Sequence, residues 1–241
     1  MQSGQRAYLI LAQSKSTQPK KINETENGFS VALLDGVTGS GKTEVYFELV
    51  KKQILLGRQC LILLPEIVLT TSWVNRFKKW VGFMPNIWHS GISAGKKKRI
   101  WREINEGHPG VAVGARSALF LPFSNLGAII VDEEHEAGYK QEEQVIYHAR
   151  DMAILRAKYA DCSIVLATAT PSLESWINVR NGRYQHIILA NRYGVATMPD
   201  IQTIDLRKFK PAFGKWISEP LLSDMQDRLK SDQQILLYLK I

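Results

Sequence analysis

Short apolar runs alternate along the chain with longer stretches in which apolar residues recur every three or four positions. The run at 60–64 (C-L-I-L-L) holds no polar residue, which is typical of a strand buried on both faces of a sheet. The stretch at 70–81 carries Trp73, Phe77 and Trp80 at helical spacing, which favours a core-facing helix over a base-stacking surface. The pattern predicts strands at 31–34, 60–64, 87–89, 111–113, 126–131, 163–167 and 184–189, and helices at 1–12, 44–56, 70–81, 96–106, 151–159 and 172–181.

This alternation of strands and helices predicts an α/β fold, with a mostly parallel sheet covered by helices on both faces. Residues 14–29 and 139–150 are polar and are expected to be loops. We expect 1–190 to form one domain. After it, a basic connector that contains proline leads to a helix at 220–229 and a strand at 234–239, so 191–241 is expected to be a connector and the truncated start of a second domain.

The sequence D-G-V-T-G-S-G-K-T at 35–43 lies between a predicted strand and a predicted helix and fits the pattern G-x-x-x-x-G-K-[ST]. Glycines let the backbone turn so that successive N–H groups point at a phosphate, and the helix adds its positive end. Lys42 would reach the β- and γ-phosphates and Thr43 would bind Mg²⁺. The alternative is a glycine-rich turn with no ligand. The residues expected to hold the nucleotide here are Gly36, Thr38, Gly39, Ser40, Gly41, Lys42 and Thr43.

Composition and charge narrow the class of protein. The chain has 241 residues, of which 45% are hydrophobic, and a net charge of +8. This apolar content suffices for a core, and the charge favours an anionic partner, nucleic acid before membrane, over a merely basic surface. No apolar run approaches the roughly 18 residues of a membrane span, so we expect no membrane partner and a cytoplasmic location. Cys60 and Cys162 are expected to be buried thiols, neither a disulfide nor a zinc site.

The sequence D-E-E-H at 132–135 follows a predicted apolar strand and offers the second half of a hydrolytic site. Asp132 is expected to bind the metal, and Glu133 to polarise the attacking water as a general base. The alternative is an acidic surface turn. His135 is placed to sense the phosphate or a neighbouring motif.

The T-A-T-P-S turn at 168–172 follows the next predicted strand. The hydroxyls of Thr168 and Thr170 are candidates for linking the nucleotide site to a nucleic acid. A plain helix cap is the alternative reading of this short motif.

The motifs together resemble those of the PriA family, the bacterial replication-restart DNA helicases of superfamily two. The P-loop and D-E-E-H are shared with other helicases, whereas Y-K-Q-E followed by Y-H-A-R-D is more specific. The similarity spans nearly the whole chain. The matching stretches are D-G-V-T-G-S-G-K-T-E-V-Y (35–46), L-P-E-I-x-L-T (64–70), H-S (89–90), G-x-R-S-A-L-F-x-P (114–122), D-E-E-H (132–135), Y-K-Q-E (139–142), Y-H-A-R-D (147–151) and A-T-P-S-L-E-S (169–175).

The resemblance implies a RecA-like P-loop domain of an ATP-dependent 3′-to-5′ DNA helicase that uses ATP and Mg²⁺ in replication-fork restart. Expected partners are forked and single-stranded DNA, the primosome and single-strand-binding proteins. Gln5 would read adenine, and an aromatic-rich loop at 139–150 would couple DNA binding to ATP hydrolysis. Aromatic faces and positive charges in that loop suit bases and phosphates. The residues expected to contact DNA are Thr70, Arg116, Tyr139, Lys140, Tyr147, His148 and Arg150.

The chain also departs from the family pattern. It lacks a glutamine near Ser72, and 142–146 differ from the family's loop. The family's N-terminal DNA-binding domain, its zinc-binding cysteines and the second RecA-like domain with its arginine finger are missing. We therefore expect weak ATP binding, slow hydrolysis and no unwinding by this chain alone. Two alternatives remain open: a double-strand DNA translocase or repair ATPase of the same superfamily, and a non-catalytic, nucleotide-dependent DNA-binding module.

Overall fold

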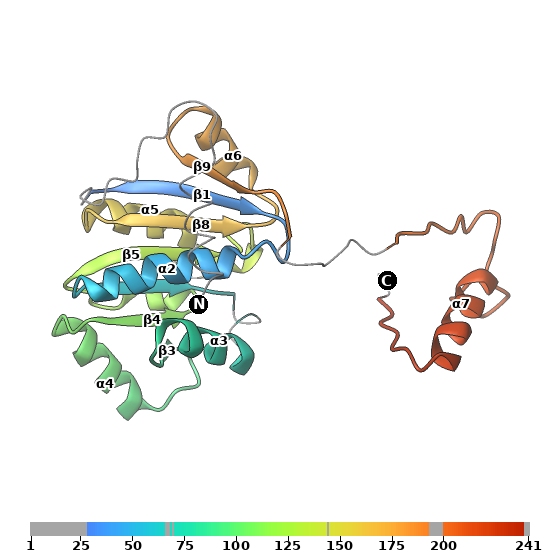
Figure 1. Cartoon of the computed structure of the whole chain (residues 1–241), viewed down its shortest axis with the longest axis horizontal. Helices are drawn as coiled ribbons and strands as arrows, with labels where there is room; N and C mark the ends of the chain where they lie inside the picture. The colour runs from blue at the N-terminus through green and yellow to red at the C-terminus, as the bar shows by residue number, and fades with distance from the viewer. Residues whose placement is uncertain (1–27, 66–67, 69, 144, 193–199, 239–241) are drawn as a thin grey trace. The chain divides into compact units, whose positions relative to one another are not determined.

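The computed structural model describes residues 28–65, 68, 70–143, 145–192 and 200–238 (Figure 1). The chain divides into two compact units, 1–195 and 196–241, and each is described by itself. The helix expected at 1–12 and the candidate adenine reader Gln5 lie outside the described residues.

The first unit is built on a seven-stranded sheet with the strand order β3-β4-β2-β5-β8-β1-β9, in which all neighbouring strands are parallel. The predicted α/β fold with a mostly parallel sheet is confirmed. The central strands β2 and β5 are buried along their whole length and mostly apolar, because both of their faces are covered. The strands are β1 (Ser30–Gly36), β2 (Gln59–Leu63), β3 (Asn86–Trp88), β4 (Gly110–Gly114), β5 (Leu126–Asp132), β8 (Ser163–Thr168) and β9 (Gln185–Leu189).

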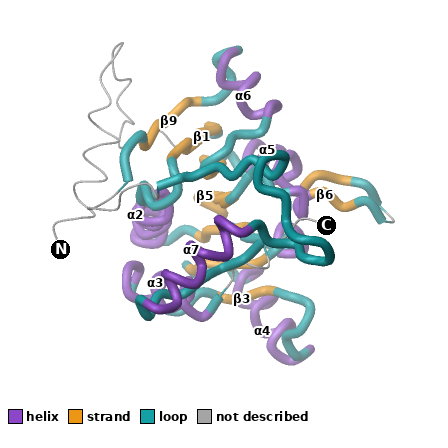
Figure 2. The backbone as a smooth tube through the Cα atoms, turned by 90° about the vertical axis from the view of Figure 1, so that its right-hand side faces the viewer, coloured by secondary structure: helices purple, strands orange, loops and turns teal. Residues whose placement is uncertain are grey.

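Helices cover both faces of this sheet, as the alternation predicted. On one face, α2 (Lys42–Leu55) and α3 (Thr71–Val81) pack on strand residues such as Leu34 and Ile62. On the other face, α4 (Ala94–Asn105) and α5 (Ala149–Tyr159) pack on their neighbours Leu33 and Leu61. Successive strand residues thus enter opposite cores, as the two-residue repeat of a strand requires. Figure 2 shows the strands lying between α2 and α5.

The segment 139–150 is more ordered than predicted. Instead of a long loop, it contains the strands β6 (Lys140–Gln141) and β7 (Tyr147–His148), which pair antiparallel, and α5 begins at Ala149. Short 3-10 helices, η1 (Arg116–Phe120) and η2 (Ala137–Tyr139), also escaped prediction. Strands of two residues are too short for their alternation to stand out in a sequence.

The remaining helices are α6 (Leu173–Arg180) in the first unit and α7 (Glu219–Lys230) in the second, both at predicted positions. Ser172 caps α6 by accepting a hydrogen bond from Ser175 N. The strand expected at 234–239 is absent over its described residues, 234–238. A strand needs a neighbour for its backbone hydrogen bonds, and this segment has none among the described residues of its own unit. In the part of the chain that the structure describes, no helix is long and apolar enough to cross a membrane.

Candidate active site

Three adjacent strands bring the sequence motifs to one edge of the sheet. β8 lies between β1 and β5, and in the register Asp35 pairs with Thr168 and Asp132 with Ala167. The P-loop, the T-A-T turn and the D-E-E-H turn therefore begin at the same level, at the carboxyl ends of parallel strands. This edge is where open α/β sheets bind their ligands.

The P-loop makes the turn that the glycines predicted. Gly39 (φ 80°) and Gly41 (φ 92°) adopt left-handed backbone conformations, and Ser40 N donates to Val37 O at 3.0 Å. Gly41 is the N-cap of α2 and supplies no side-chain hydrogen bond to its first turn. The N–H groups at the start of α2 thus lack a side-chain cap, as suits a helix end that receives an anion.

Gly36 and Lys42 contact each other at the base of this loop. A Cβ atom on Gly36 would lie 2.5 Å from Ser40 Oγ and 2.9 Å from Leu189 Cβ, so only glycine fits there. The buried Lys42 ammonium donates to Gly36 O at 2.6 Å. Ser40 Oγ is also buried and has no hydrogen-bond partner among the described residues. An ammonium, an unpartnered hydroxyl and uncapped N–H groups around one loop fit a phosphate chain.

Asp132 closes the site from β5. Its carboxylate is buried, accepting hydrogen bonds from Tyr46 OH at 2.8 Å and from Glu133 N at 3.1 Å. Burial raises the pKa of Asp132 from 3.8 to about 6, against the hydrogen bond from Tyr46, which lowers it. Trp73 Nε1 in turn donates to Tyr46 OH at 3.4 Å.

Tyr46 and Trp73 belong to this site although sequence reasoning had left both out of it. Tyr46 follows Lys42 by four residues on α2, so the two share a helical face. That spacing was the available signal for Tyr46. Trp73 had been assigned to the core, which is correct, but its indole N–H also reaches the site.

The turn after Asp132 is tight and linked to β8. Glu133 has φ 49°, a left-handed conformation that is costly for a residue with a side chain. Glu136 N donates to Glu133 O at 2.8 Å, which closes the turn, and Glu134 N donates to Ala167 O at 3.1 Å. Strain of this kind persists where the surrounding contacts hold the backbone, and it sets the direction of the Glu133 side chain.

The three candidate coupling residues come together. His135 Nδ1 lies 2.7 Å from Thr168 Oγ1 and 3.6 Å from Glu133 Oε2. Thr170 N donates to the same Thr168 oxygen at 3.1 Å. Thr168 is fully buried, whereas Thr170 is exposed. A direct contact thus joins the D-E-E-H turn to the T-A-T turn.

Glu134 is a buried residue with several hydrogen-bond partners, and it was not predicted as a site residue. Its carboxylate accepts hydrogen bonds from Arg150 Nη1 (3.0 Å), Ser172 N (2.7 Å), Ser172 Oγ (3.0 Å) and Ser175 Oγ (2.9 Å). Because the side chain is fully buried, these partners satisfy a charge that would otherwise be costly. The turn after β5 is therefore fastened to the first residues of both α5 and α6.

Two residues expected to contact DNA lie in the interior. Tyr139 is 2% exposed, and its hydroxyl donates to Leu63 O at 3.0 Å and Asp132 O at 2.7 Å. Arg150 is 5% exposed and paired with Glu134. Neither presents a stacking face or a free charge, so the prediction for these two is corrected. The apolar neighbours of Tyr139 in the core and the buried acid beside Arg150 determined their places.

The other candidate DNA contacts lie at or near the surface. Thr70 is exposed and caps α3, accepting from Trp73 N at 3.3 Å. Arg116 Nη1 donates to Lys140 O at 2.8 Å, which ties η1 to the β6–β7 hairpin, and Lys140 pairs with Glu142 at 2.8 Å. Tyr147, half-buried, packs edge-to-face on Phe120 with ring centroids 5.5 Å apart.

His148 stands apart from these surface residues. It is half-buried, its Nδ1 atom has no hydrogen-bond partner in the part of the chain that the structure describes, and burial lowers its pKa. The ring is therefore biased toward its neutral form.

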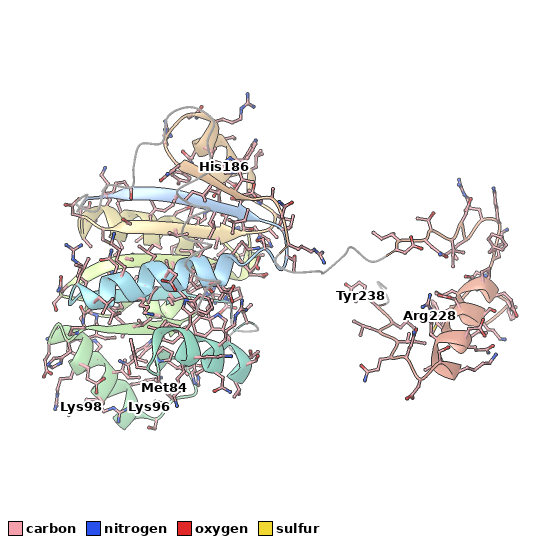
Figure 3. All side chains as sticks on the ribbon, viewed as in Figure 1. Met84, Lys96, Lys98, His186, Arg228 and Tyr238 are labelled. Carbon is pink, nitrogen blue, oxygen red and sulfur yellow. The ribbon has the colours of Figure 1, made fainter. Side chains whose placement is uncertain are left out.

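A further histidine lies beside the start of the P-loop. His186 on β9, labelled in Figure 3, has its Nε2 atom 3.2 Å from Asp35 Oδ2 on β1. Its ring packs edge-to-face on Trp176, with ring centroids 5.2 Å apart. Among the described residues, no group of three or more histidine, cysteine, aspartate or glutamate side chains is arranged to hold a metal by itself. Cys60 and Cys162 are buried, as expected, and both are free thiols in this structure.

Comparison with known proteins gives the motifs a family context. The DEAD/DEAH box helicase family model matches residues 15–178. Replication restart protein PriA of Rickettsia felis is 42% identical over 230 residues, which cover 95% of this chain and 36% of the relative. The protein of the same name from Haemophilus influenzae is 45% identical over 213 residues, covering 88% and 29%. That from Bacillus subtilis is 40% identical over 228 residues, covering 94% and 28%. The chain thus spans about a third of the length of these curated relatives.

Solved structures share the fold. The structure of RecG bound to a three-way DNA junction matches with a TM-score of 0.50 at 20% identity, over 69% of this chain and 21% of that chain. The helicase domain of Hef from Pyrococcus furiosus matches with a TM-score of 0.50 at 17% identity, over 76% and 38%. At these identities, the likeness shows a helicase RecA-like fold.

Proposed function

The chain belongs to the DEAD/DEAH box helicase family, and from this we propose that it is the ATP-binding motor domain of an ATP-dependent DNA helicase. One observation carries the proposal. The P-loop and the Asp132–Glu133 pair lie at the same edge of the sheet, on strands separated only by β8. This arrangement supplies phosphate-binding groups and two carboxylates to one site, which ATP hydrolysis requires.

In this proposal the P-loop binds the phosphates of ATP. Lys42 would exchange its hydrogen bond to Gly36 O for the β- and γ-phosphate oxygens, with Ser40 Oγ as a further donor. Uncapped N–H groups of the first α2 turn would bind phosphate oxygens as well. Gly36, Thr38, Gly39 and Gly41 give the loop its close backbone approach, and Gln5 remains the proposed adenine reader.

Thr43, the second residue of α2, and Asp132 would hold Mg²⁺. When bound there, the ion neutralises charge on the phosphate oxygens. The Asp132 carboxylate is fixed by two hydrogen bonds, so it is oriented before any ligand arrives. Glu133 would act as the general base that orients and deprotonates the attacking water. His135, which lies near Glu133 and bonds Thr168, would report the state of this carboxylate to the T-A-T turn.

On the nucleic-acid side, we propose that Thr70, Arg116 and Lys140 contact backbone phosphates and that Tyr147 and His148 contact bases. The first three are polar groups at or near the surface, on three different segments, and the chain carries a net charge of +8. Positive side chains lower the free energy of binding a polyanion, and aromatic rings add stacking. Tyr139 and Arg150 would act indirectly, by holding the hairpin and the D-E-E-H turn together.

The similarity to replication restart proteins extends the proposal to biology. We propose 3′-to-5′ translocation in replication-fork restart, with forked or single-stranded DNA, primosome proteins and single-strand-binding proteins as partners. For the 241-residue chain itself we propose weak ATP binding, slow turnover and no unwinding. One RecA-like unit forms one wall of the site, and phosphoryl transfer draws much of its rate from an arginine supplied by another unit. Robust DNA-stimulated turnover by this chain would contradict that part.

The nucleotide site is tested by the affinity of the chain for a fluorescent ATP analogue in the presence of Mg²⁺. Lys42→Ala should weaken binding by on the order of tenfold or more, since it removes a charged hydrogen-bond donor from the phosphates. Lys51→Ala is the matched control, because Lys51 is exposed on the same helix. Equal affinities for the two variants would rule out the assignment of the P-loop.

A further inference from the structure

Hydrogen bonds connect α3 to the Asp132 carboxylate by way of Tyr46 on α2. Thr70 Oγ1 accepts from Trp73 N at 3.3 Å, Trp73 Nε1 donates to Tyr46 OH at 3.4 Å, and Tyr46 OH donates to Asp132 Oδ2 at 2.8 Å. Thr70 is exposed, Trp73 is 7% exposed, and Tyr46 is fully buried. Three separate segments, α3, α2 and β5, are thereby linked through the Tyr46 hydroxyl.

The rings of Tyr46 and Trp73 are packed tightly against other aromatic side chains. Tyr46 meets Phe47 edge-to-face at 5.1 Å between ring centroids, and Phe47 meets Trp73 edge-to-face at 5.4 Å. Trp73 also stacks on Phe77 at 5.5 Å. Packing of this kind holds a side chain in one rotamer, so the Tyr46 hydroxyl is presented to Asp132 from a fixed position.

The hydroxyl contacts only one of the two carboxylate oxygens, and the other accepts from Glu133 N. Each carboxylate oxygen keeps a lone pair for another ligand. Groups that hydrogen-bond to a metal-binding side chain without binding the metal themselves orient that side chain and raise its affinity for the metal. The contacts around Asp132 have this form.

We propose that Tyr46 is a positioning residue for the Asp132 carboxylate and that Trp73 holds Tyr46 in place. The inference rests on the proposed nucleotide site and adds a role for two residues outside the P-loop and the D-E-E-H motif. In this proposal both residues act through Asp132, and neither is assigned a contact of its own with the nucleotide or the metal. Their effect is on the affinity for the divalent cation, not on the affinity for the metal-free nucleotide.

The chain supplies a matched control for each position. Tyr159 is the exposed last residue of α5 and lies shortly before β8 begins, at the edge of the sheet opposite the site. Trp80 lies on α3 like Trp73 and also donates its indole N–H to α2, but to Glu48 Oε1 at 2.6 Å. Tyr159→Phe and Trp80→Phe thus remove the same chemical groups without affecting Asp132.

The experiment measures binding of Mn²⁺, by electron paramagnetic resonance, to the 241-residue chain saturated with a non-hydrolysable ATP analogue. Analogue affinity in EDTA is measured alongside, with thermal unfolding as a check of folding. Tyr46→Phe should weaken Mn²⁺ binding by about tenfold and leave the affinity in EDTA unchanged. Trp73→Phe should weaken it by roughly two- to threefold, as loss of one long hydrogen bond allows. Tyr159→Phe and Trp80→Phe should leave the Mn²⁺ affinity at the wild-type value.

Equal Mn²⁺ affinities for Tyr46→Phe and Tyr159→Phe would overturn the positioning role, and equal affinities for Trp73→Phe and Trp80→Phe would overturn the role of Trp73. If Tyr46→Phe does not fold, Trp73→Phe still tests the proposed positioning of Asp132, because this variant keeps the Tyr46 hydroxyl. Failure of the wild-type chain to bind the analogue at all would instead overturn the proposed nucleotide site. The two failures are therefore distinguishable.

Discussion

Arg150 Nη1 donates a hydrogen bond of 3.0 Å to Glu134 Oε2 in the interior of the protein. Glu134 is the third residue of D-E-E-H, and Arg150 is the second residue of α5. The pair therefore connects the turn that carries Glu133 to the helix that follows the β6–β7 hairpin. Ser172 and Ser175 add α6 to the same connection. Any movement of the hairpin base would act on this turn.

Arg150→Ala should lower the free energy of unfolding by about 3–5 kcal/mol, because it leaves the Glu134 charge buried without its cationic partner. Denaturant unfolding of wild type and variant measures this directly. Lys140→Ala provides the comparison, since Lys140 forms an exposed ion pair with Glu142 and its loss should matter little. Similar unfolding midpoints for the two variants would contradict the proposal that Arg150 stabilises the fold by pairing with Glu134.

Local patterns made the site's framework predictable. The spacing of Gly36, Gly41 and Lys42 determines the shape of one turn, and the apolar run before Asp132 determines which end of a strand it occupies. Parallel pairing then brings the two together. None of these steps requires knowledge of long-range side-chain packing, so the sequence was sufficient for the fold class and for the meeting of both motifs.

The positions and partners of the Tyr139, Arg150 and Tyr46 side chains were not predictable from local patterns. An aromatic or basic side chain in a polar segment suits DNA or the interior equally well, and the choice depends on distant partners. Leu63 O receives the Tyr139 hydroxyl and Glu134 receives Arg150, across 76 and 16 residues of sequence. Tyr46 reaches Asp132 across 86 residues. Such contacts exist only once the sheet has formed.

Asp132 should make stability depend on pH. Burial raises its pKa from 3.8 to about 6, so the folded protein holds this proton more tightly than the unfolded chain. The resulting stability is present below about pH 4 and is lost as the pH rises through about 6. In EDTA, the wild type should therefore lose stability relative to Asp132→Asn between these values. Urea unfolding of both proteins at several pH values measures the difference, and a difference that does not change with pH would contradict the shifted pKa.

Gly36→Ala should abolish nucleotide binding, because the new Cβ would lie 2.5 Å from Ser40 Oγ and push the P-loop out of shape. Overpacking of this kind also costs about 1–3 kcal/mol of stability. Gly95→Ala is the control: Gly95 lies in α4 with no atom within 4 Å of the added Cβ, and stability should stay the same or rise slightly. Titration with a fluorescent ATP analogue compares them, and normal binding by Gly36→Ala would show that the loop has room to adapt.

Thr168→Val should uncouple the two turns while preserving their packing. The valine has nearly the same shape but offers no hydrogen bond to His135 Nδ1 or Thr170 N. Leaving these groups unpaired costs about 1–3 kcal/mol, so ATP turnover should fall by roughly fivefold or more while nucleotide affinity changes little. Thr170→Val should have the smaller effect, because its side chain is exposed. A larger effect from Thr170→Val would reverse the assignment.

We propose above that this edge of the sheet hydrolyses ATP with Lys42 and Glu133. The most direct test of this claim is steady-state ATP turnover by the 241-residue chain, with and without forked DNA, for the wild type, Lys42→Ala and Glu133→Gln. We expect slow turnover by the wild type and none by either variant, with Glu133→Gln still binding ATP. Turnover by Lys42→Ala at the wild-type rate would contradict the claim.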